Sequence, residues 1–269
     1  MSTLTARAPI VVVPTHEVAA RAADVIAEVV GRRPDAVLGY ATGRTPLALY
    51  AELARRVHAG ALDLSATRAV ALDEYAGLAA SDPRSFAAYL RREVVGPLGI
   101  DPRNVHLLDG SGASEAVLAG RCAAYDTLLD ALGVDLQVVG IGRNGHLAFN
   151  EPGTPFGATT RVTVLAESTR RDNADAFGGD PSTVPSRALT QGPATIARAH
   201  TILLVATGGG KADAVAAAFD GPIDPVCPAS LLQRHPHLRA VLDPPAAAGL
   251  SRRGRGFTPS DSPTAKEQR

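Results

Sequence analysis

The sequence has no tryptophan, one methionine, two cysteines and, before its last few residues, a single lysine, Lys211. The cysteines, Cys122 and Cys227, are too far apart in the chain for a metal-binding motif or a disulfide framework, so we expect a reducing, cytoplasmic location and no metal. The formal net charge is zero, which argues against a basic nucleic-acid-binding surface. No apolar run is long enough for a membrane span, so no membrane partner is expected, and residues 10–13 are interpreted as a first strand.

What the chain does contain is a regular alternation of apolar runs and helical patterns. This alternation, in a chain long enough for one large domain, is typical of a parallel sheet covered by helices. We predict an α/β fold: a doubly wound, mostly parallel, Rossmann-like sheet with helices on both faces. The predicted strands are Ile10–Val13, Ala36–Tyr40, Ala69–Leu72, Val105–Leu108, Leu136–Ile141, Ile202–Ala206 and Ala240–Leu242, and the predicted helices are Val18–Val30, Pro46–Val57, Ser85–Val95, Ala113–Leu132 and Lys211–Phe219.

Two segments depart from this alternation. Residues 153–195 are polar and interrupted by glycine and proline, with a short strand at Val162–Leu165 and a weak helix at Ser168–Phe177. We interpret them as a lid-like insertion at the rim of a site. The end of the chain is rich in arginine, serine and proline, which is typical of a disordered tail. The predicted organisation is therefore one domain over residues 1–245, with the insertion at 153–195, and a tail over 246–269.

Ligands of open parallel sheets bind beyond the carboxyl ends of the strands, so the residues after each strand are candidates for a binding site. The second predicted strand is followed by Thr42, Gly43, Arg44, Thr45 and Pro46. We expect Thr45 to cap a helix with Pro46 at its first position, and Gly43 to permit a tight turn. Free backbone amides, two hydroxyls and Arg44 would form an anion pocket, although an ordinary capped helix would show the same pattern.

A second glycine-rich turn, TGGGK, follows the strand at Ile202–Ala206 and ends in Lys211. By itself it is compatible with a flexible turn and a solvated lysine. Two such turns in one sheet favour a phosphorylated small molecule as the ligand.

Two adjacent carboxylates, Asp73 and Glu74, follow the third predicted strand. Adjacent acids at the end of a buried strand are rarely core residues. One of them could act as a general base while the other is structural, and a helix-capping or turn role is the alternative.

The stretch VVGIGRNGHLAFNEP, residues 138–152, contains a literal GxGxxG. A dinucleotide site would need a helix to begin at its third glycine, Gly145, but Pro152 disfavours helical geometry at Glu151. A tight loop that carries Asn144, His146 and Glu151 fits better. A histidine beside a carboxylate is typical of proton transfer, whereas an isolated histidine would more often be structural.

The segments ATGRTP, LDEYAGL, GIGRNGHLAFNEPGTPF and GGGK, in this order, resemble the motifs of the glucosamine-6-phosphate deaminase family. The resemblance extends from about residue 12 to residue 243. It implies an aldose–ketose isomerase and deaminase that opens the sugar ring, removes the C2 proton and releases ammonia to give fructose 6-phosphate. It also implies no metal or redox cofactor. Members of the family range from single subunits to hexamers, so the resemblance allows a homo-oligomer.

The resemblance assigns roles to the residues already singled out. Asp73 would remove the C2 proton and return a proton to C1, and His146 would assist ring opening with Glu151 and Asn144 positioning it. The 6-phosphate would be held by Thr42, Gly43, Thr45 and Lys211.

Two positions depart from the family's pattern. The family usually has a small residue at the position of Arg44 and an arginine near the phosphate at the position of Asp175. We hypothesise that Arg44 supplies the missing positive charge and pairs with Asp175 when no substrate is bound. The alternative is that Asp175 lies on the rim and contacts nothing.

These departures leave other functions open. With an N-acetylated amino-sugar phosphate, the same C2 carbanion could expel the C3 hydroxyl, which would make the protein a dehydratase. A lactone hydrolase resembling 6-phosphogluconolactonases would share the fold but would explain Asp73 and His146 less well. A non-catalytic sugar-phosphate sensor is a further alternative, although no segment apart from the predicted disordered tail remains to form a helix-turn-helix.

Overall fold

The computed structural model describes residues 10–112 and 114–251. Its main sheet has seven strands: β1 (Ile10–Val12), β2 (Val37–Tyr40), β3 (Arg68–Ala71), β5 (Val105–His106), β6 (Leu136–Val139), β9 (Thr201–Ala206) and β10 (Leu238–Leu242). Their order is β1-β10-β9-β6-β2-β3-β5, and all six pairings are parallel. Each of the seven predicted strands is therefore confirmed, within a few residues at its ends.

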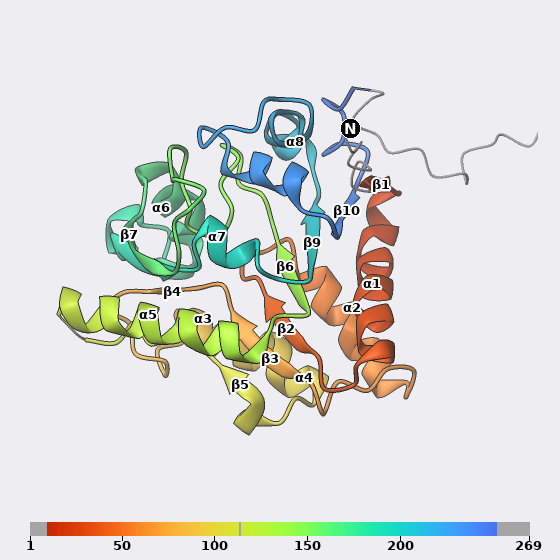
Figure 1. The fold of residues 1–269 in the computed structure, drawn as a ribbon, viewed down its shortest axis with the longest axis horizontal. Coiled ribbons are helices and arrows are strands. Elements are labelled where there is room, and N and C mark those ends of the chain that lie inside the picture. The colour runs from red at the N-terminus through yellow and green to blue at the C-terminus, as the bar shows by residue number, and fades with distance from the viewer. Residues whose placement is uncertain (1–9, 113, 252–269) are drawn as a thin grey trace, which may run out of the picture.

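Helices cover both faces of this sheet, as Figure 1 shows. On one face lie α1 (Val18–Arg32) and α2 (Leu47–His58), and on the other lies α5 (Glu115–Leu132). The short helices are α3 (Phe86–Leu90), α4 (Gly96–Leu98), α6 (Glu167–Asn173), α7 (Pro193–Ile196) and α8 (Ala212–Phe219). The predicted doubly wound α/β architecture is thus confirmed.

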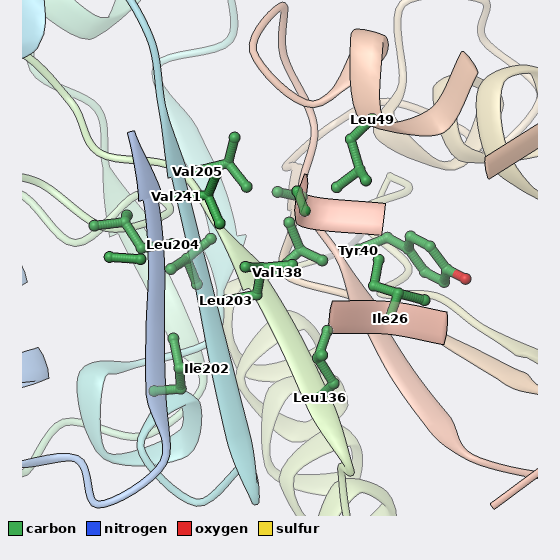
Figure 2. Packing of buried hydrophobic residues seen from close by; sticks show 14 of the residues in the cluster. Ile26, Tyr40, Leu49, Leu136, Val138, Ile202, Leu203, Leu204, Val205 and Val241 are labelled. Atoms are coloured by element: carbon green, nitrogen blue, oxygen red, sulfur yellow. The ribbon is translucent and has the colours of Figure 1, made fainter. Parts of the chain in front are cut away.

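The alternation of side chains along β2 explains why helices must cover both faces of the main sheet. Leu38 packs with Ile26 of α1 and Leu49 of α2 in the larger apolar cluster, while Val37 packs in the cluster under α5. Figure 2 shows the larger cluster, in which residues of β6 and β9, including Val138 and Leu203, lie close to those of the helices. Burial on both faces is the reason that these strands appear as continuous apolar runs in the sequence.

The insertion is a packed layer of its own. β7 (Arg161–Val164) and β8 (Arg187–Thr190) form a three-stranded antiparallel sheet with β4 (Asp73–Tyr75). The prediction placed one strand and one helix here, and both exist, as β7 and as α6 followed by a 3₁₀ turn at Ala174–Phe177. β8 was missed, and so was β4, which has three residues and carries two carboxylates.

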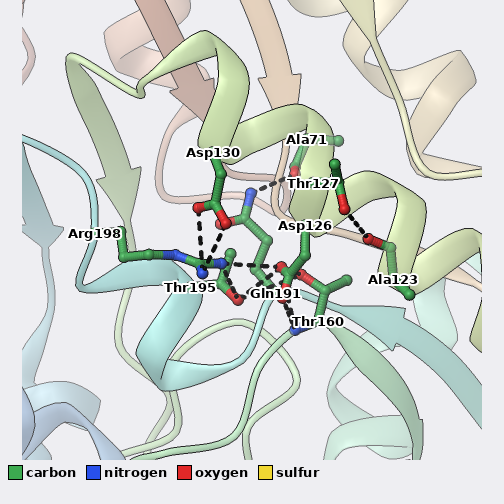
Figure 3. Close-up of polar contacts among 9 residues, drawn as sticks. All are labelled: Ala71, Ala123, Asp126, Thr127, Asp130, Thr160, Gln191, Thr195 and Arg198. Carbon is green, nitrogen blue, oxygen red and sulfur yellow. Dashed lines mark hydrogen bonds and ion pairs between the residues drawn. The ribbon is translucent and has the colours of Figure 1, made fainter.

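Apolar and polar contacts attach the insertion to the rest of the fold. The ring of Tyr75 lies 5.7 Å from that of Phe149 and 5.3 Å from that of Phe177, centroid to centroid. The carboxylate of Asp126, a residue of α5, accepts hydrogen bonds from the hydroxyls of Thr160 and Thr195 (Figure 3). These contacts hold the small sheet against the main one.

The predicted boundary of the tail needs a correction. Ala246, Ala247 and Leu250 are buried in the main apolar cluster, so the folded chain continues beyond residue 245, at least to Leu250. The remaining part of the predicted tail, residues 252–269, lies outside the described residues.

Candidate active site

The candidate residues gather at one edge of the main sheet because four adjacent strands end there. β9, β6, β2 and β3 are consecutive neighbours, and all run in the same direction. The chain winds from β2 through β3 to β5 on one side and from β6 through β9 to β10 on the other, so the winding reverses between β2 and β6. Such a reversal is where open α/β sheets bind ligands.

Asp73 begins β4, two residues after β3 ends. Its side chain is buried, and Oδ1 has no hydrogen-bond partner within the described residues. Burial, with a smaller contribution from the charge of Glu74, raises the pKa of Asp73 to about 8, and the neighbouring Thr42 hydroxyl opposes this shift. A carboxyl group with a pKa near neutrality can accept and return a proton at physiological pH.

Glu74 is structural. Its carboxylate accepts hydrogen bonds from the backbone amides of Tyr75 (2.8 Å), Phe86 (3.0 Å) and Ala87 (2.8 Å), and so caps the start of α3. Burial raises the pKa of Glu74, and these bonds oppose the rise. Because successive side chains of a strand point to opposite sides, one of the adjacent acids caps a helix while the other is left for chemistry.

The loop after β6 is a tight turn, and no helix begins over residues 140–152, all of which the structure describes. The Gly142 amide donates to the His146 carbonyl at 2.9 Å, and the Gly145 amide donates to the Gly142 carbonyl at 3.0 Å. Gly145 has a φ of +83°, which a side chain would make unfavourable. The GxGxxG therefore builds a compact loop, as predicted, and lacks the helix of a dinucleotide site.

The loop brings three predicted residues together. Asn144 Nδ2 donates to Glu151 Oε2 at 2.9 Å, and Asn144 Oδ1 accepts from the His146 amide at 3.2 Å. Glu151 Oε2 lies 3.8 Å from His146 Nδ1. Burial lowers the pKa of His146, the charge of Lys211 lowers it further, and Glu151 and Asp172 oppose this. The lowered pKa favours the neutral imidazole, which can accept a proton.

Asn150 and Arg161, to which the sequence assigned no role, hold this loop. Asn150 Nδ2 donates to the carbonyls of Leu147 and Gln191, each at 2.8 Å, and Asn150 Oδ1 accepts from Arg161 Nη1 at 2.7 Å. Ala148, which lies between Leu147 and Asn150, has a φ of 52°, the single positive φ of a non-glycine residue in the described part of the chain. The loop is held in a strained conformation, as is common at functional sites.

The turn after β2 carries Thr42, Gly43, Arg44 and Thr45. Gly43 has a φ of +97°, and its carbonyl accepts a hydrogen bond from the Tyr89 hydroxyl at 2.7 Å. The predicted cap is wrong by one residue: Pro46, not Thr45, is the N-cap of α2, because the Tyr50 amide donates to the Pro46 carbonyl. The hydroxyl of Thr45 therefore does not cap the helix.

A cavity of about 240 Å³ opens between this turn and the end of β9. Its polar side chains are Thr15, Arg44, Thr45 and Thr207. Another cavity, of about 110 Å³, is mostly apolar and contains none of the predicted site residues.

The turn after β9 presents Lys211, whose side chain is partly buried. Burial lowers the pKa of Lys211, the nearby charge of Arg143 lowers it further, and Asp172 opposes this. The turn itself is held by Asp243, which accepts from the Gly208 amide at 3.0 Å. Arg143, Asp172 and Asp243 were not predicted, since a single charged residue carries no signal until the fold brings it to the site.

Arg44 and Asp175 form an ion pair through Nη2 and Oδ2. Asp175 belongs to the 3₁₀ turn after α6, so the pair connects the insertion to the turn after β2. The hypothesis of this pairing is confirmed, and the alternative that Asp175 contacts nothing is wrong.

Among residues 10–112 and 114–251, no group of three histidine, cysteine or acidic residues is arranged to hold a metal ion. Nor does that part of the chain contain a helix long and apolar enough to cross a membrane.

Known proteins resemble this chain over most of its length. Residues 13–241 match the model of a family described as glucosamine-6-phosphate isomerases/6-phosphogluconolactonase. The glucosamine-6-phosphate deaminase of Streptomyces coelicolor is 49% identical over 85% of this chain and 87% of its own. That of Cutibacterium acnes is 49% identical over 86% and 87%.

Solved structures give the same fold. A monomeric glucosamine-6-phosphate deaminase superposes with a TM-score of 0.85 at 37% identity, covering 90% of this chain and 99% of its own. The 6-phosphogluconolactonase of Trypanosoma brucei superposes with a TM-score of 0.73 at 22% identity, covering 91% and 99%, and this likeness concerns the fold alone.

Proposed function

Because the chain belongs to the glucosamine-6-phosphate isomerase/6-phosphogluconolactonase family, we propose that it converts glucosamine 6-phosphate and water into fructose 6-phosphate and ammonia. The observation that carries this proposal is the buried carboxyl of Asp73, with a free Oδ1 and a pKa of about 8, on the same sheet edge as the His146 loop.

The spacing of the strands suits a sugar placed between Asp73 and His146. β3, which leads to Asp73, and β6, which leads to His146, both neighbour β2, so their ends are about 10 Å apart. The two segments are also connected, because the Phe149 amide donates to the hydroxyl of Thr190, the residue opposite Asp73 in β8. An extended hexose can reach from one to the other.

In the proposed reaction His146 starts the chemistry. Its neutral imidazole would take the proton of the anomeric hydroxyl and give a proton to the ring oxygen, which opens the pyranose to the aldehyde. Glu151, held by Asn144, would stabilise the imidazolium that forms in between.

Asp73 would then act on the open chain. Its carboxylate would remove the C2 proton while the ammonium group of the substrate passes a proton to O1, which gives an enolamine. The resulting acid would return the proton to C1, so that a protonated imine forms at C2. Water adds to this imine and ammonia leaves, which completes the ketose.

The phosphate would be held at the turns after β2 and β9. Thr42, Gly43 and Thr45 would offer amides and hydroxyls on one side and Lys211 a positive charge on the other. Arg44 would exchange Asp175 for the phosphate and so replace the arginine that the family's pattern has at position 175.

The function is tested by incubating the purified protein separately with glucosamine 6-phosphate and with its N-acetyl derivative. Ammonia, ketose phosphate and an ultraviolet-absorbing unsaturated product are measured in each. Ammonia and ketose phosphate from the free amine support the proposal. An unsaturated product from the N-acetyl sugar, without ammonia from the free amine, would replace it with the dehydratase.

We propose the cytoplasm as the location, supported by the two unpaired cysteines Cys122 and Cys227. We propose that the protein is a single subunit, supported by its similarity to a monomeric glucosamine-6-phosphate deaminase. Light scattering of the active protein distinguishes this from a homo-oligomer.

A further inference from the structure

The carboxylate of Glu151 is held at both of its oxygens, by two different parts of the chain. Oε2 accepts the hydrogen bond from Asn144, seven residues earlier in the same loop. Oε1 accepts a hydrogen bond from the hydroxyl of Thr169, which belongs to α6 in the insertion. The loop after β6 therefore does not position its own acid alone.

Other contacts also hold Thr169 and its helix in place. Its side chain is buried, and its carbonyl accepts from Asn173 Nδ2 at 2.8 Å. The next residue, Arg170, donates to the carbonyls of Val184 at 3.1 Å and Ser182 at 3.0 Å, which anchors α6 to the segment that follows it. The hydroxyl is thus presented to Glu151 by a supported helix.

The position of Glu151 matters because of what lies beside it. His146 Nδ1 is buried, has no hydrogen-bond partner within the described residues, and lies 3.8 Å from Glu151 Oε2. A rotation of the carboxylate would change this distance and with it the orientation of the imidazole. Groups that hold a carboxylate beside a histidine commonly set the tautomer and orientation of the ring.

We propose that Thr169 is a positioning residue: by holding Glu151 Oε1 it sets the relation of Glu151 to His146 and makes the insertion part of the ring-opening apparatus. The catalytic consequence rests on the proposed function. The hydroxyl is the feature that matters, because valine has the same shape as threonine but would leave a largely buried carboxylate oxygen without its hydrogen bond.

The test compares Thr169→Val, Thr169→Ser and a control, Thr163→Val, which changes a half-buried threonine of β7 in the same insertion. With glucosamine 6-phosphate we expect Thr169→Val to lower kcat by roughly 10-fold or more and to change KM by less than about 3-fold, as expected for a misplaced catalytic group. Thr169→Ser and Thr163→Val should keep kcat within about 3-fold of the original protein. Binding of the acyclic analogue 2-amino-2-deoxyglucitol 6-phosphate, which needs no ring opening, should be unchanged in all three.

A double-mutant cycle separates positioning from a general loss of structure. In a Glu151→Gln background, Thr169→Val should cause little further loss, because its effect passes through the Glu151 carboxylate. An equal loss in both backgrounds, or unchanged kcat in Thr169→Val, overturns the proposal.

A measurement without substrate keeps this inference apart from the proposed function. The ¹⁵N chemical shifts of the His146 ring should change in Thr169→Val but not in Thr163→Val. If these shifts change while the original protein releases no ammonia, the proposed function fails and the positioning role stands. If the protein is active and the shifts stay the same, the positioning role fails.

Discussion

Arg44 and Asp175, which are 131 residues apart in the chain, form an ion pair between the turn after β2 and the insertion. Both side chains are largely exposed, at 85% and 72% of their full areas. Such pairs contribute little to stability. A substrate phosphate can therefore replace Asp175 as the partner of Arg44 at little cost to the fold.

We predict that Arg44→Gly raises KM for glucosamine 6-phosphate by roughly 10-fold and leaves kcat nearly unchanged, because it removes a charge that holds the phosphate throughout the reaction. Asp175→Asn should lower KM, since it removes a competitor. Steady-state kinetics at low and high salt measure both. Arg103→Gly, which removes an exposed arginine paired with Asp101, is the control. An unchanged KM in Arg44→Gly would contradict the proposed exchange, in which the substrate phosphate replaces Asp175 as the partner of Arg44.

The exposed charge pair could be anticipated from the sequence, since an acid at a position expected to face a phosphate needs a partner. The strands of the main sheet could be predicted for a different reason: burial on both faces requires continuous apolar runs. Two strands of the small sheet, β4 and β8, could not be predicted from the sequence. β4 begins with two carboxylates, and β8 pairs with β7 across the insertion, so tertiary contacts and not local pattern specify them.

The residues of the candidate site likewise divide into those that the sequence predicts and those that it does not. Asp73, Asn144, His146 and Glu151 stand in motifs with a dense polar pattern, and sequence reasoning found them. Thr169 and Asp172 lie in a weakly patterned helix of the insertion, and Asn150 could be taken as one more polar residue of the motif. Their roles depend on where the insertion folds back, which no local signal encodes.

We predict that Asp73→Asn abolishes turnover while binding of the acyclic analogue stays within about 3-fold, because an amide cannot accept the C2 proton but keeps the shape of the side chain. Exchange of the C2 hydrogen with deuterated solvent, followed by NMR, should stop in the variant. Continued exchange would mean that another group is the base.

The activity should also report the pKa of Asp73. The base must be ionised, and its pKa is raised to about 8 by burial, so kcat/KM should increase as the pH rises towards 8 and level off above it. An ordinary aspartate would give a constant value over this range. Initial rates between pH 6 and pH 9 with saturating and limiting substrate measure the profile. A flat profile would rule out Asp73 as a base with a raised pKa.

Gly145 is a further test of the loop after β6. An added Cβ would lie 2.6 Å from Cys227 Sγ, and the φ of +83° is unfavourable for any side chain. We predict that Gly145→Ala lowers Tm by roughly 2–6 °C and reduces kcat, since the loop carries His146. Gly60→Ala, where φ is +67° and no described atom lies within 4 Å of the added Cβ, should show the backbone strain alone. Adding Cys227→Ala should recover part of the loss in Gly145→Ala and none in Gly60→Ala.

The raised pKa of Asp73 also predicts how stability depends on pH. The carboxyl titrates at about 8 when folded and near 4 when unfolded, so the folded state binds its proton more tightly over this range. Stability therefore falls as the pH rises from about 4 to about 8, and Asp73→Asn, which has no proton to lose, escapes that fall. We expect the variant to be more stable than the original by on the order of 2–4 kcal/mol at pH 7, with the difference shrinking towards pH 5. Urea denaturation of both proteins between pH 5 and pH 8 measures it, with the exposed Asp175→Asn as the control. A difference that stays constant with pH would show that Asp73 titrates normally in the folded protein.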